Sequence, residues 1–104
     1  MSEIALIYTL FPSSAEAERV CKTLLQENLV ACANRFAPAI SHFRWEGEVQ
    51  AQEEHPVLLK ANLDTAEQAR DRLAELHSYD LPAILMWTAK TDAPFAGWVE
   101  TNIA

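Results

Sequence analysis

A tight-turn signal lies in the middle of the chain, between two long runs that favour β-strand. Residues 45–48 read Trp-Glu-Gly-Glu, and Gly47 accepts the positive φ that tight hairpin turns need. The flanking runs, residues 29–44 and 49–63, are longer than the usual five or six residues of a strand. The distal half of such a hairpin outruns the core of a small domain and needs a second covering surface. Another copy of the chain can supply it, so we expect an obligate oligomer.

The first part of the chain predicts a strand followed by an amphipathic helix. Residues 4–10 form a near-continuous apolar run, which is typical of a central strand buried on both faces. Ser13 and Glu16 form a capping box, so a helix is expected to begin there and to stop at Asn28, which tolerates the left-handed conformation. Its apolar stripe comprises Ala17, Val20, Cys21, Leu24 and Leu25.

Prolines and polar residues mark changes within the two halves of the hairpin. Pro38 predicts a bulge or an edge position in the second strand, because proline cannot donate to a sheet ladder. His55-Pro56 predicts a similar irregularity in the third strand. Between the turn and that point the strand is polar, with Gln50, Gln52, Glu53 and Glu54, so we expect it to be half exposed.

The remaining residues predict a helix, a strand and a short terminal helix. Asp64 and Glu67 form a second capping box, and the helix that they open is expected to end near His77-Ser78. Residues 83–88 predict a fourth strand. Asp92 is expected to cap a last short helix, which docks by a face containing Phe95, Trp98, Val99 and Asn102.

The order of these elements predicts an α+β fold of the ferredoxin-like βαββαβ type in one domain, residues 1–104. The hairpin between the second and third strands is extended, and a short helix is added at the carboxy terminus. The right-handed crossover rule places both long helices on one face of a four-stranded antiparallel sheet. The other face is then bare and apolar, which is a second reason to expect an oligomer.

Charge and hydropathy exclude several classes of partner. The formal net charge is -7 and the eight basic residues form no patch, so neither nucleic acid nor an anionic membrane is expected as a partner. No apolar run approaches the roughly 20 residues of a membrane span, and no signal peptide is recognisable, so we expect a cytoplasmic protein. Cys21 and Cys32 are interpreted as two buried reduced thiols, with a redox pair as the alternative.

Four blocks of the sequence, together with Trp98, resemble the CutA family of divalent-cation tolerance proteins. Residues 27–34, ENLVACAN, are similar to its E-x-L-A-A-C-V-N signature, and residues 41–48, SHFRWEGE, to its S-x-Y-x-W-E-G-K hairpin. Residues 58–61, LLKA, resemble L-x-x-K-T, and residues 77–84, HSYDLPAI, resemble H-P-Y-x-x-P-E-I. The blocks occur in order and with near-fixed spacing, which makes them more specific together than singly.

The resemblance implies a ferredoxin-like subunit in a homotrimer whose extended hairpins clamp neighbouring subunits. It assigns Phe43, Trp45 and Glu46 to the subunit interface, with Trp45 as the residue most expected to be buried there. It also implies that the protein has a role involving copper, as Cu(II), or another divalent cation. No cation is expected to be required for folding. No catalytic reaction is attached to the family.

The chain departs from the family pattern at several positions where a metal is expected. Thr9 stands where copper sites of the family have a Cys, and Leu76 precedes His77. Ser78, Ala83 and Glu48 replace the family's Pro, Glu and Lys. The metal role therefore carries over through His77 alone, and a single imidazole without a thiolate is a poor Cu(I) ligand set.

Each histidine also has an interpretation without a metal. His77 is expected at a helix end, where a partly charged imidazole can interact with the helix dipole as a C-cap. His42 and His55 are interpreted as surface or interface residues. The acidic hairpin residues Glu46, Glu48, Glu53 and Glu54 could attract divalent cations, but a solvated strand that resists aggregation explains them as well.

The leading interpretation is a CutA-like homotrimer involved in divalent metal, especially copper, tolerance or homeostasis, with weak or degenerate metal binding at His77. The alternative is a PII-like trimeric small-ligand sensor or scaffold, in which Arg35, Arg44 and Lys60 contribute positive charge to clefts between subunits. An enzyme is not expected, because no combination of nucleophile, base and orienting residue is visible.

Overall fold

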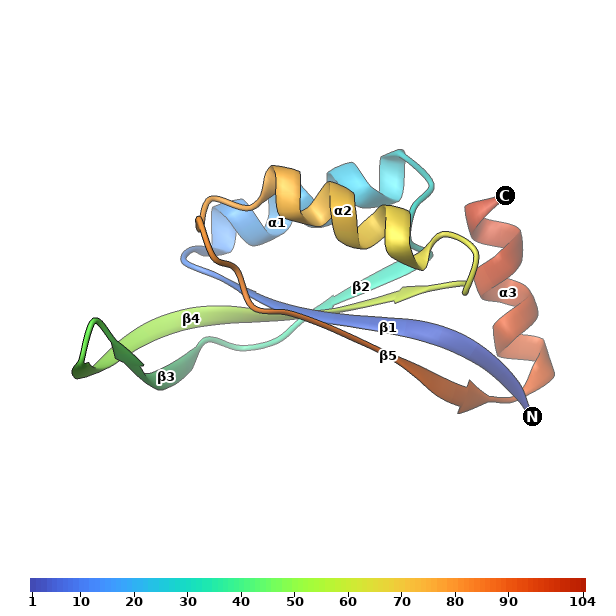
Figure 1. The fold of residues 1–104 in the computed structure, drawn as a ribbon. Helices are drawn as coiled ribbons and strands as arrows, with labels where there is room; N and C mark the ends of the chain where they lie inside the picture. The colour runs from blue at the N-terminus through green and yellow to red at the C-terminus, as the bar shows by residue number, and fades with distance from the viewer.

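The computed structural model describes residues 1–104 and contains an antiparallel sheet covered on one face by two helices (Figure 1). The elements in chain order are β1 (Ser2–Phe11), α1 (Ser14–Gln26), β2 (Cys32–Arg35), β3 (Ala39–Trp45), β4 (Glu48–Ala61), α2 (Ala66–Leu76), β5 (Ile84–Thr91) and α3 (Ala93–Ile103). The strand order is β2-β4-β1-β5, and β3 pairs with β4 beyond that path. The ferredoxin-like prediction is confirmed, with the predicted second strand divided into β2 and β3.

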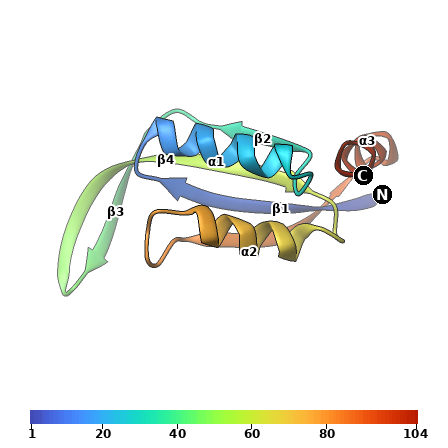
Figure 2. The same ribbon diagram turned by 90° about the horizontal axis from the view of Figure 1, so that it is seen from above.

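The hairpin turn has the geometry that its sequence predicts. Trp45 pairs with Glu48, and the two residues between them, Glu46 and Gly47, have φ values of 50° and 82°. Positive φ at both central positions is the mark of the tight turns that match strand twist. The hairpin extends from one end of the domain, which measures 45 × 26 × 23 Å (Figure 2).

The predicted irregularity at His55-Pro56 is wrong, since β4 runs unbroken through both residues. In an antiparallel strand the N–H and C=O of one residue face the same neighbour. The carbonyl of Pro56 accepts a hydrogen bond from the N–H of Phe36 at 3.0 Å, so the missing N–H of Pro56 faces the gap between β2 and β3. The interruption expected around Pro38 lies in that gap, and the ladder loses little there.

Helix α1 begins and ends as predicted. The hydroxyl of Ser13 accepts the N–H of Glu16 at 3.2 Å. At the other end Asn28 has a φ of 59°, and its N–H reaches the carbonyl of Leu25 while that of Leu29 reaches Leu24. These two bonds form a Schellman motif, which satisfies carbonyls that a helix end otherwise leaves free.

Helix α2 ends at the predicted place, with His77 as its C-cap, but it begins differently. The predicted capping box of Asp64 and Glu67 is wrong, because Thr65 is the N-cap and makes no side-chain cap bond. Instead the amide oxygen of Asn62 accepts the N–H of Thr65 at 2.8 Å. Asn three residues earlier competes for the same turn, as its short side chain can bond nearby backbone.

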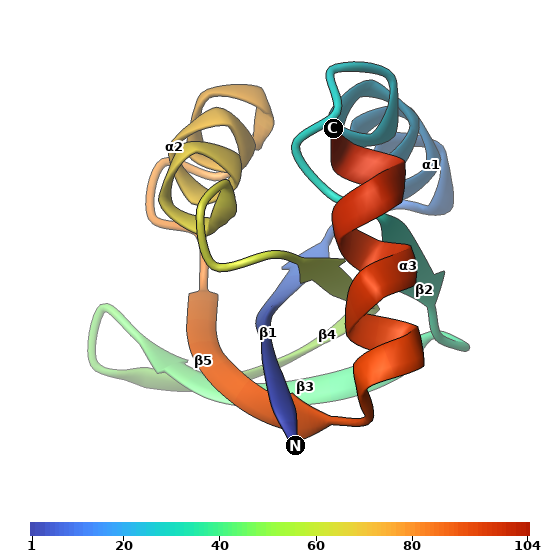
Figure 3. The ribbon, with the colours of Figure 1, turned by 90° about the vertical axis from the view of Figure 1, so that its right-hand side faces the viewer.

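The core lies between the helices and one face of the sheet. Along β1, residues Ala5, Ile7, Thr9 and Phe11 are buried under the helices, whereas Leu6, Tyr8 and Leu10 on the opposite face are half-buried. Burial of this strand on both faces is therefore wrong for the single chain. The bare sheet face is confirmed, since both long helices lie on the other side of the sheet (Figure 3). On this bare face Leu85 is 57% exposed and Trp87 is 46% exposed.

The terminal helix α3 stands at the end of the sheet and docks by Phe95, Val99 and Ile103. Asp92 caps it by accepting the N–H of Phe95 at 3.0 Å, as predicted. Val99 and Ile103 are buried, whereas Trp98 is 46% exposed and stacks on Phe95 at the rim. The predicted docking face is therefore confirmed for Val99 and for Phe95, which packs half-buried against the core four residues before Val99. It is wrong for Trp98 and Asn102, which are exposed. The structure contains no helix that is both long enough and apolar enough to cross a membrane.

Candidate functional site

A groove of about 520 Å³ separates the hairpin from the loop that follows α2. Phe43 and Trp45 from β3, and Gln52 from β4, line it on the hairpin side. These side chains share one face of the hairpin because strand residues alternate and paired residues point the same way. Tyr79 from the loop and Leu10 from β1 line the opposite side, so the groove continues onto the bare sheet face.

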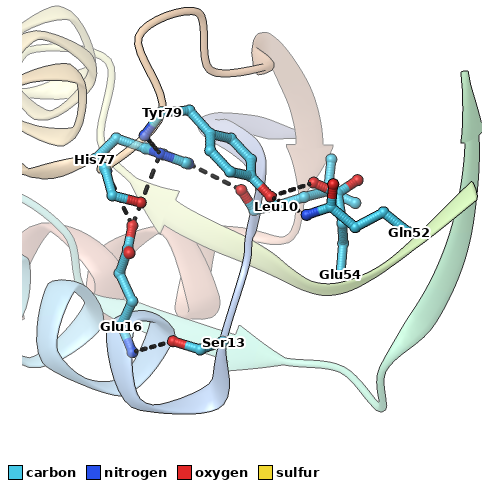
Figure 4. Close-up of polar contacts among 8 residues, drawn as sticks. Leu10, Ser13, Glu16, Gln52, Glu54, His77 and Tyr79 are labelled. Atoms are coloured by element: carbon cyan, nitrogen blue, oxygen red, sulfur yellow. Dashed lines mark hydrogen bonds and ion pairs between the residues drawn. The ribbon is translucent and has the colours of Figure 1, made fainter. Parts of the chain in front are cut away.

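The imidazole of His77 lies buried beside the groove and has two main-chain partners (Figure 4). Its Nε2 lies 2.8 Å from the carbonyl oxygen of Leu10, and its Nδ1 accepts the N–H of Tyr79 at 3.2 Å. Because a carbonyl only accepts, Nε2 carries the proton and the ring is neutral in this arrangement. The ring also stacks on Phe11, with centroids 4.6 Å apart.

These contacts bear directly on the metal interpretation of His77. Coordination through either ring nitrogen would require one of the two hydrogen bonds to break. The carboxylate of Glu16 lies 3.8 Å from Nδ1, and no group of three or more His, Cys, Asp or Glu side chains is placed to hold a metal ion. His77 as a metal ligand stays a prediction. Its position as the C-cap of α2 is confirmed, although the neutral ring is not the cation expected there.

The other positions of the family's metal pattern differ in their burial and hydrogen bonding. Thr9 is fully buried and its hydroxyl has no hydrogen-bond partner. Leu76 packs against the core, whereas Ala83 is exposed. The main-chain N–H of Ser78 donates to Glu16 at 3.0 Å, so a proline at this position would lose that bond.

Sequence reasoning missed two residues that organise this site, Glu16 and Tyr79. Glu16 was expected to complete a capping box with Ser13, yet its carboxylate accepts from Ser78 instead. The hydroxyl of Tyr79 donates to Glu54 at 2.9 Å and accepts from the amide of Gln52 at 2.9 Å. The only sequence signal for either role was the place of Tyr79 in the block that contains His77.

The surroundings of Tyr79 alter its acidity. Burial, followed by the hydrogen bond to the carboxylate of Glu54, raises the pKa of Tyr79 to about 12. The hydroxyl is thus protonated at neutral pH and donates a hydrogen bond to the carboxylate of Glu54. A neutral donor bonded to a carboxylate forms one of the stronger types of hydrogen bond.

The predicted interface residues lie at the end of the hairpin. Phe43 is half-buried, while Trp45 is 49% exposed and Glu46 is exposed at the turn. Their contact with another subunit stays a prediction. Among the histidines, His42 is exposed on the hairpin, and Nε2 of His55 lies 4.0 Å from the carboxylate of Glu53.

The three cations proposed for a ligand cleft are not brought together. The guanidinium of Arg35 donates to the carbonyl of Ser14 at 3.3 Å, at the start of α1. The ammonium of Lys60 lies 5.7 Å from the centre of the Phe95 ring, near α3. Only Arg44 borders the groove.

Both cysteines are free. Cys21 is buried as expected, and burial raises the pKa of its thiol to about 11. Cys32 is half-buried, so full burial of both thiols is wrong for the single chain, although burial also raises the pKa of Cys32. Raised pKa values leave little thiolate at neutral pH, which disfavours the redox-pair alternative.

Comparisons with known proteins give one consistent match. The family model described as CutA1 divalent ion tolerance protein matches residues 5–102. The divalent-cation tolerance protein CutA of Pyrococcus horikoshii is 42% identical over 80 residues, covering 77% of this chain and 78% of the relative. That of Archaeoglobus fulgidus is 41% identical over 98 residues, covering 93% and 95%. The crystal structure of CutA1 from Ehrlichia chaffeensis matches with a TM-score of 0.94 and 33% identity, covering 100% and 98%.

Proposed function

Because the chain belongs to the CutA1 divalent ion tolerance family, we propose that it is a non-enzymatic homotrimer that acts in divalent-cation tolerance and binds metal weakly. Copper, as Cu(II), is the first cation to test. A cytoplasmic location is part of the same proposal, and fractionation of cells that express the chain tests it.

The observation that carries self-assembly is the continuous apolar surface that the single chain leaves exposed. On the bare sheet face, Leu6 pairs with Trp87 and Tyr8 pairs with Leu85, so these four side chains form one contiguous patch. Exposed apolar patches of this kind mark interaction sites. We propose that this patch packs against a second copy of the same chain in a trimer.

Two free strand edges support the same proposal. Strand β5 pairs only with β1 and β3 pairs only with β4, so each has one edge of unpaired N–H and C=O groups. Unprotected edges with exposed apolar side chains favour pairing with another strand. Pairing of β3 in one copy with β5 in the next would use both of these edges, and the same contact can repeat around a closed ring.

Weak metal binding follows from the contacts of His77. Its ring nitrogens are engaged by Leu10 and Tyr79, so a metal must compete with two hydrogen bonds before it gains one ligand. A single imidazole also falls short of the three or four ligands of a tight site. We therefore propose that any Cu(II) bound at His77 is held loosely.

Calorimetric titration of Cu(II) into chelator-stripped protein tests the metal part of the proposal. The expected result is saturable binding at up to one ion per chain, which His77→Ala abolishes and His42→Ala leaves intact. His42 is the matched control because its imidazole is exposed on β3, opposite Ala51 and on the other face of the hairpin from the groove residue Phe43. A flat titration of the parent protein, or equal loss in both variants, removes His77 as a metal ligand.

The PII-like alternative has one observation in its favour, the groove itself, whose volume lies in the range of small-molecule sites. Only Arg44 of the three proposed cations borders it, so an anionic ligand would find little charge there. Thermal unfolding with a panel of nucleotides and metabolites tests this alternative, because a ligand that binds the native state must raise its stability. The absence of any shift at high ligand concentration would exclude it.

A further inference from the structure

The outer part of the hairpin has little to hold it against the domain. We call residues 39–54, which comprise β3 and the paired half of β4, the arm. Strand β1 ends at Phe11 opposite His55, so the arm extends past the sheet that covers the core. The side-chain hydrogen bonds that join the arm to the rest of the domain both end at the hydroxyl of Tyr79.

Tyr79 is itself fixed to the body of the domain. Its main-chain N–H donates to Nδ1 of His77, and its ring lies 5.0 Å from the imidazole, centre to centre. His77 in turn contacts the carbonyl of Leu10 (Figure 4). The main-chain N–H of the neighbouring Ser78 donates to Glu16 on α1. A loop tied to both β1 and α1 therefore presents one hydroxyl to the arm.

We propose that the Tyr79 hydroxyl is a latch that holds the arm against the domain in the unassembled chain, and so preforms the groove that receives the next copy. The inference rests on the proposed self-assembly and adds a positioning residue to it. The groove continues through Leu10 onto the bare sheet face, where Leu85 and Trp87 are exposed. A second copy seated on that face would thus enter the groove as part of one surface.

The physical basis of the latch is the marginal stability of an isolated hairpin. Two strands without a covering surface are at best marginally stable in water, so an arm released from the body would fray. Fixing the arm in advance also lowers the ordering cost that assembly would otherwise carry. Glu54 and Gln52 bond the same hydroxyl as acceptor and donor, so one atom controls both contacts.

Hydrogen exchange at several chain concentrations, with the mass measured on the same samples, tests the latch. The variants are Tyr79→Phe, which keeps the ring beside His77, Glu54→Ala and the double variant. Glu53→Ala is the matched control, because Glu53 lies on the opposite face of β4 and its carboxylate is 4.0 Å from His55. Amides of β1 report whether the fold is intact.

In dilute protein, we expect Tyr79→Phe and Glu54→Ala each to accelerate exchange of arm amides roughly tenfold, the loss expected for a hydrogen bond to a charged group. The double variant should be no faster than Tyr79→Phe, since loss of the hydroxyl already removes the contact with Glu54. Exchange in β1 and in Glu53→Ala should stay as in the parent. The chain concentration needed for assembly of Tyr79→Phe should rise by a similar factor.

Two results would overturn the inference. Unchanged arm exchange in Tyr79→Phe, at a concentration where the protein has the mass of a single chain, would show that the hydroxyl does not hold the arm. Faster exchange with unaltered assembly would show that the latch has no part in receiving the next copy. Failure of the proposed assembly would be distinct from both, because the parent protein itself would then have the mass of a single chain.

Discussion

Nε2 of His77 lies 2.8 Å from the carbonyl oxygen of Leu10, so the imidazole that the sequence offers as a metal ligand joins a helix end to the central strand. The same ring accepts a hydrogen bond from the N–H of Tyr79. The hydroxyl of Tyr79 in turn bonds Glu54 and Gln52 of the hairpin. His77 is thus part of the fold's internal bonding, so its imidazole has a structural role that needs no metal.

The core prediction concerns two adjacent leucines of α1. Leu24 is fully buried, and we expect Leu24→Ala to lower the free energy of unfolding by about 2–5 kcal/mol, from lost transfer energy and the cavity left behind. Leu25 is 38% exposed, so Leu25→Ala should cost about 1 kcal/mol or less. Chemical denaturation at equal chain concentration makes the comparison, and equal losses would contradict the assigned helix face.

The interface prediction concerns Trp45 at the end of the hairpin. If this side chain is buried between subunits, Trp45→Ala should raise the dissociation constant of the trimer by about 30-fold or more, the effect of a hot-spot residue. Trp98→Ala is the control, because Trp98 is nearly as exposed but lies on α3 at the other end of the domain. Sedimentation over a range of dilutions measures the dissociation constants of both variants. A Trp45→Ala trimer as stable as the parent would contradict the burial of Trp45 between subunits.

The acid-stability prediction concerns Glu27, whose carboxylate receives two hydrogen bonds of 2.8 Å from Arg72. These bonds lower the pKa of Glu27 below its ordinary 4.5. The ionised form is therefore favoured by folding, and its contribution is present above about pH 4.5 and is lost as the pH falls through the lowered pKa.

Glu27→Gln should accordingly flatten the loss of stability below pH 4.5. Glu75→Gln removes a carboxylate 3.7 Å from the same guanidinium but none of the paired bonds, and it should keep the slope of the parent. Thermal unfolding at successive pH values between 3 and 6 compares the three proteins. Identical slopes for the parent and Glu27→Gln would show that the pair does not link the two helices in solution.

The alkaline prediction concerns Tyr79. Because folding raises its pKa to about 12 from 10, the neutral hydroxyl is favoured in the folded state. Stability is retained below about pH 10 and falls as the pH rises from 10 towards 12. The chain has two tyrosines, so ultraviolet titration of tyrosinate can separate them by comparison with Tyr79→Phe.

In that titration the parent should show a component near pH 12 that is absent from Tyr79→Phe. Glu54→Gln should move the component part of the way towards pH 10, since burial remains the larger cause of the shift. A single transition near 10 for both tyrosines of the parent would contradict the buried, hydrogen-bonded hydroxyl.

Local signals predicted the parts of the fold that local chemistry determines. Gly47 predicted the turn because the required φ is open to few residues, and Ser13 and Asn28 predicted both ends of α1. The pattern of Asp64 and Glu67 failed because Asn62, two residues earlier, competes for the same backbone. Pro56 was misread because the strand facing it is interrupted, which its own neighbours in sequence do not reveal.

The candidate site was less predictable because its partners are distant in sequence. Glu16 and Ser78 are 62 residues apart, and Glu54 and Tyr79 are 25 apart, so no spacing rule brings either pair together. The resemblance to the family drew attention to His77, yet the contacts that occupy its two nitrogens come from β1 and from its own loop. These contacts depend on how the layers pack, which the residue pattern alone does not specify.

Native mass spectrometry of the parent protein tests self-assembly, the central claim, most directly. The chain has a mass of 11.7 kDa, and the account predicts a closed assembly of three chains. A protein that remains a single chain at the highest concentrations would contradict it, because the bare sheet face, the free edges and the exposed hairpin would then have no partner.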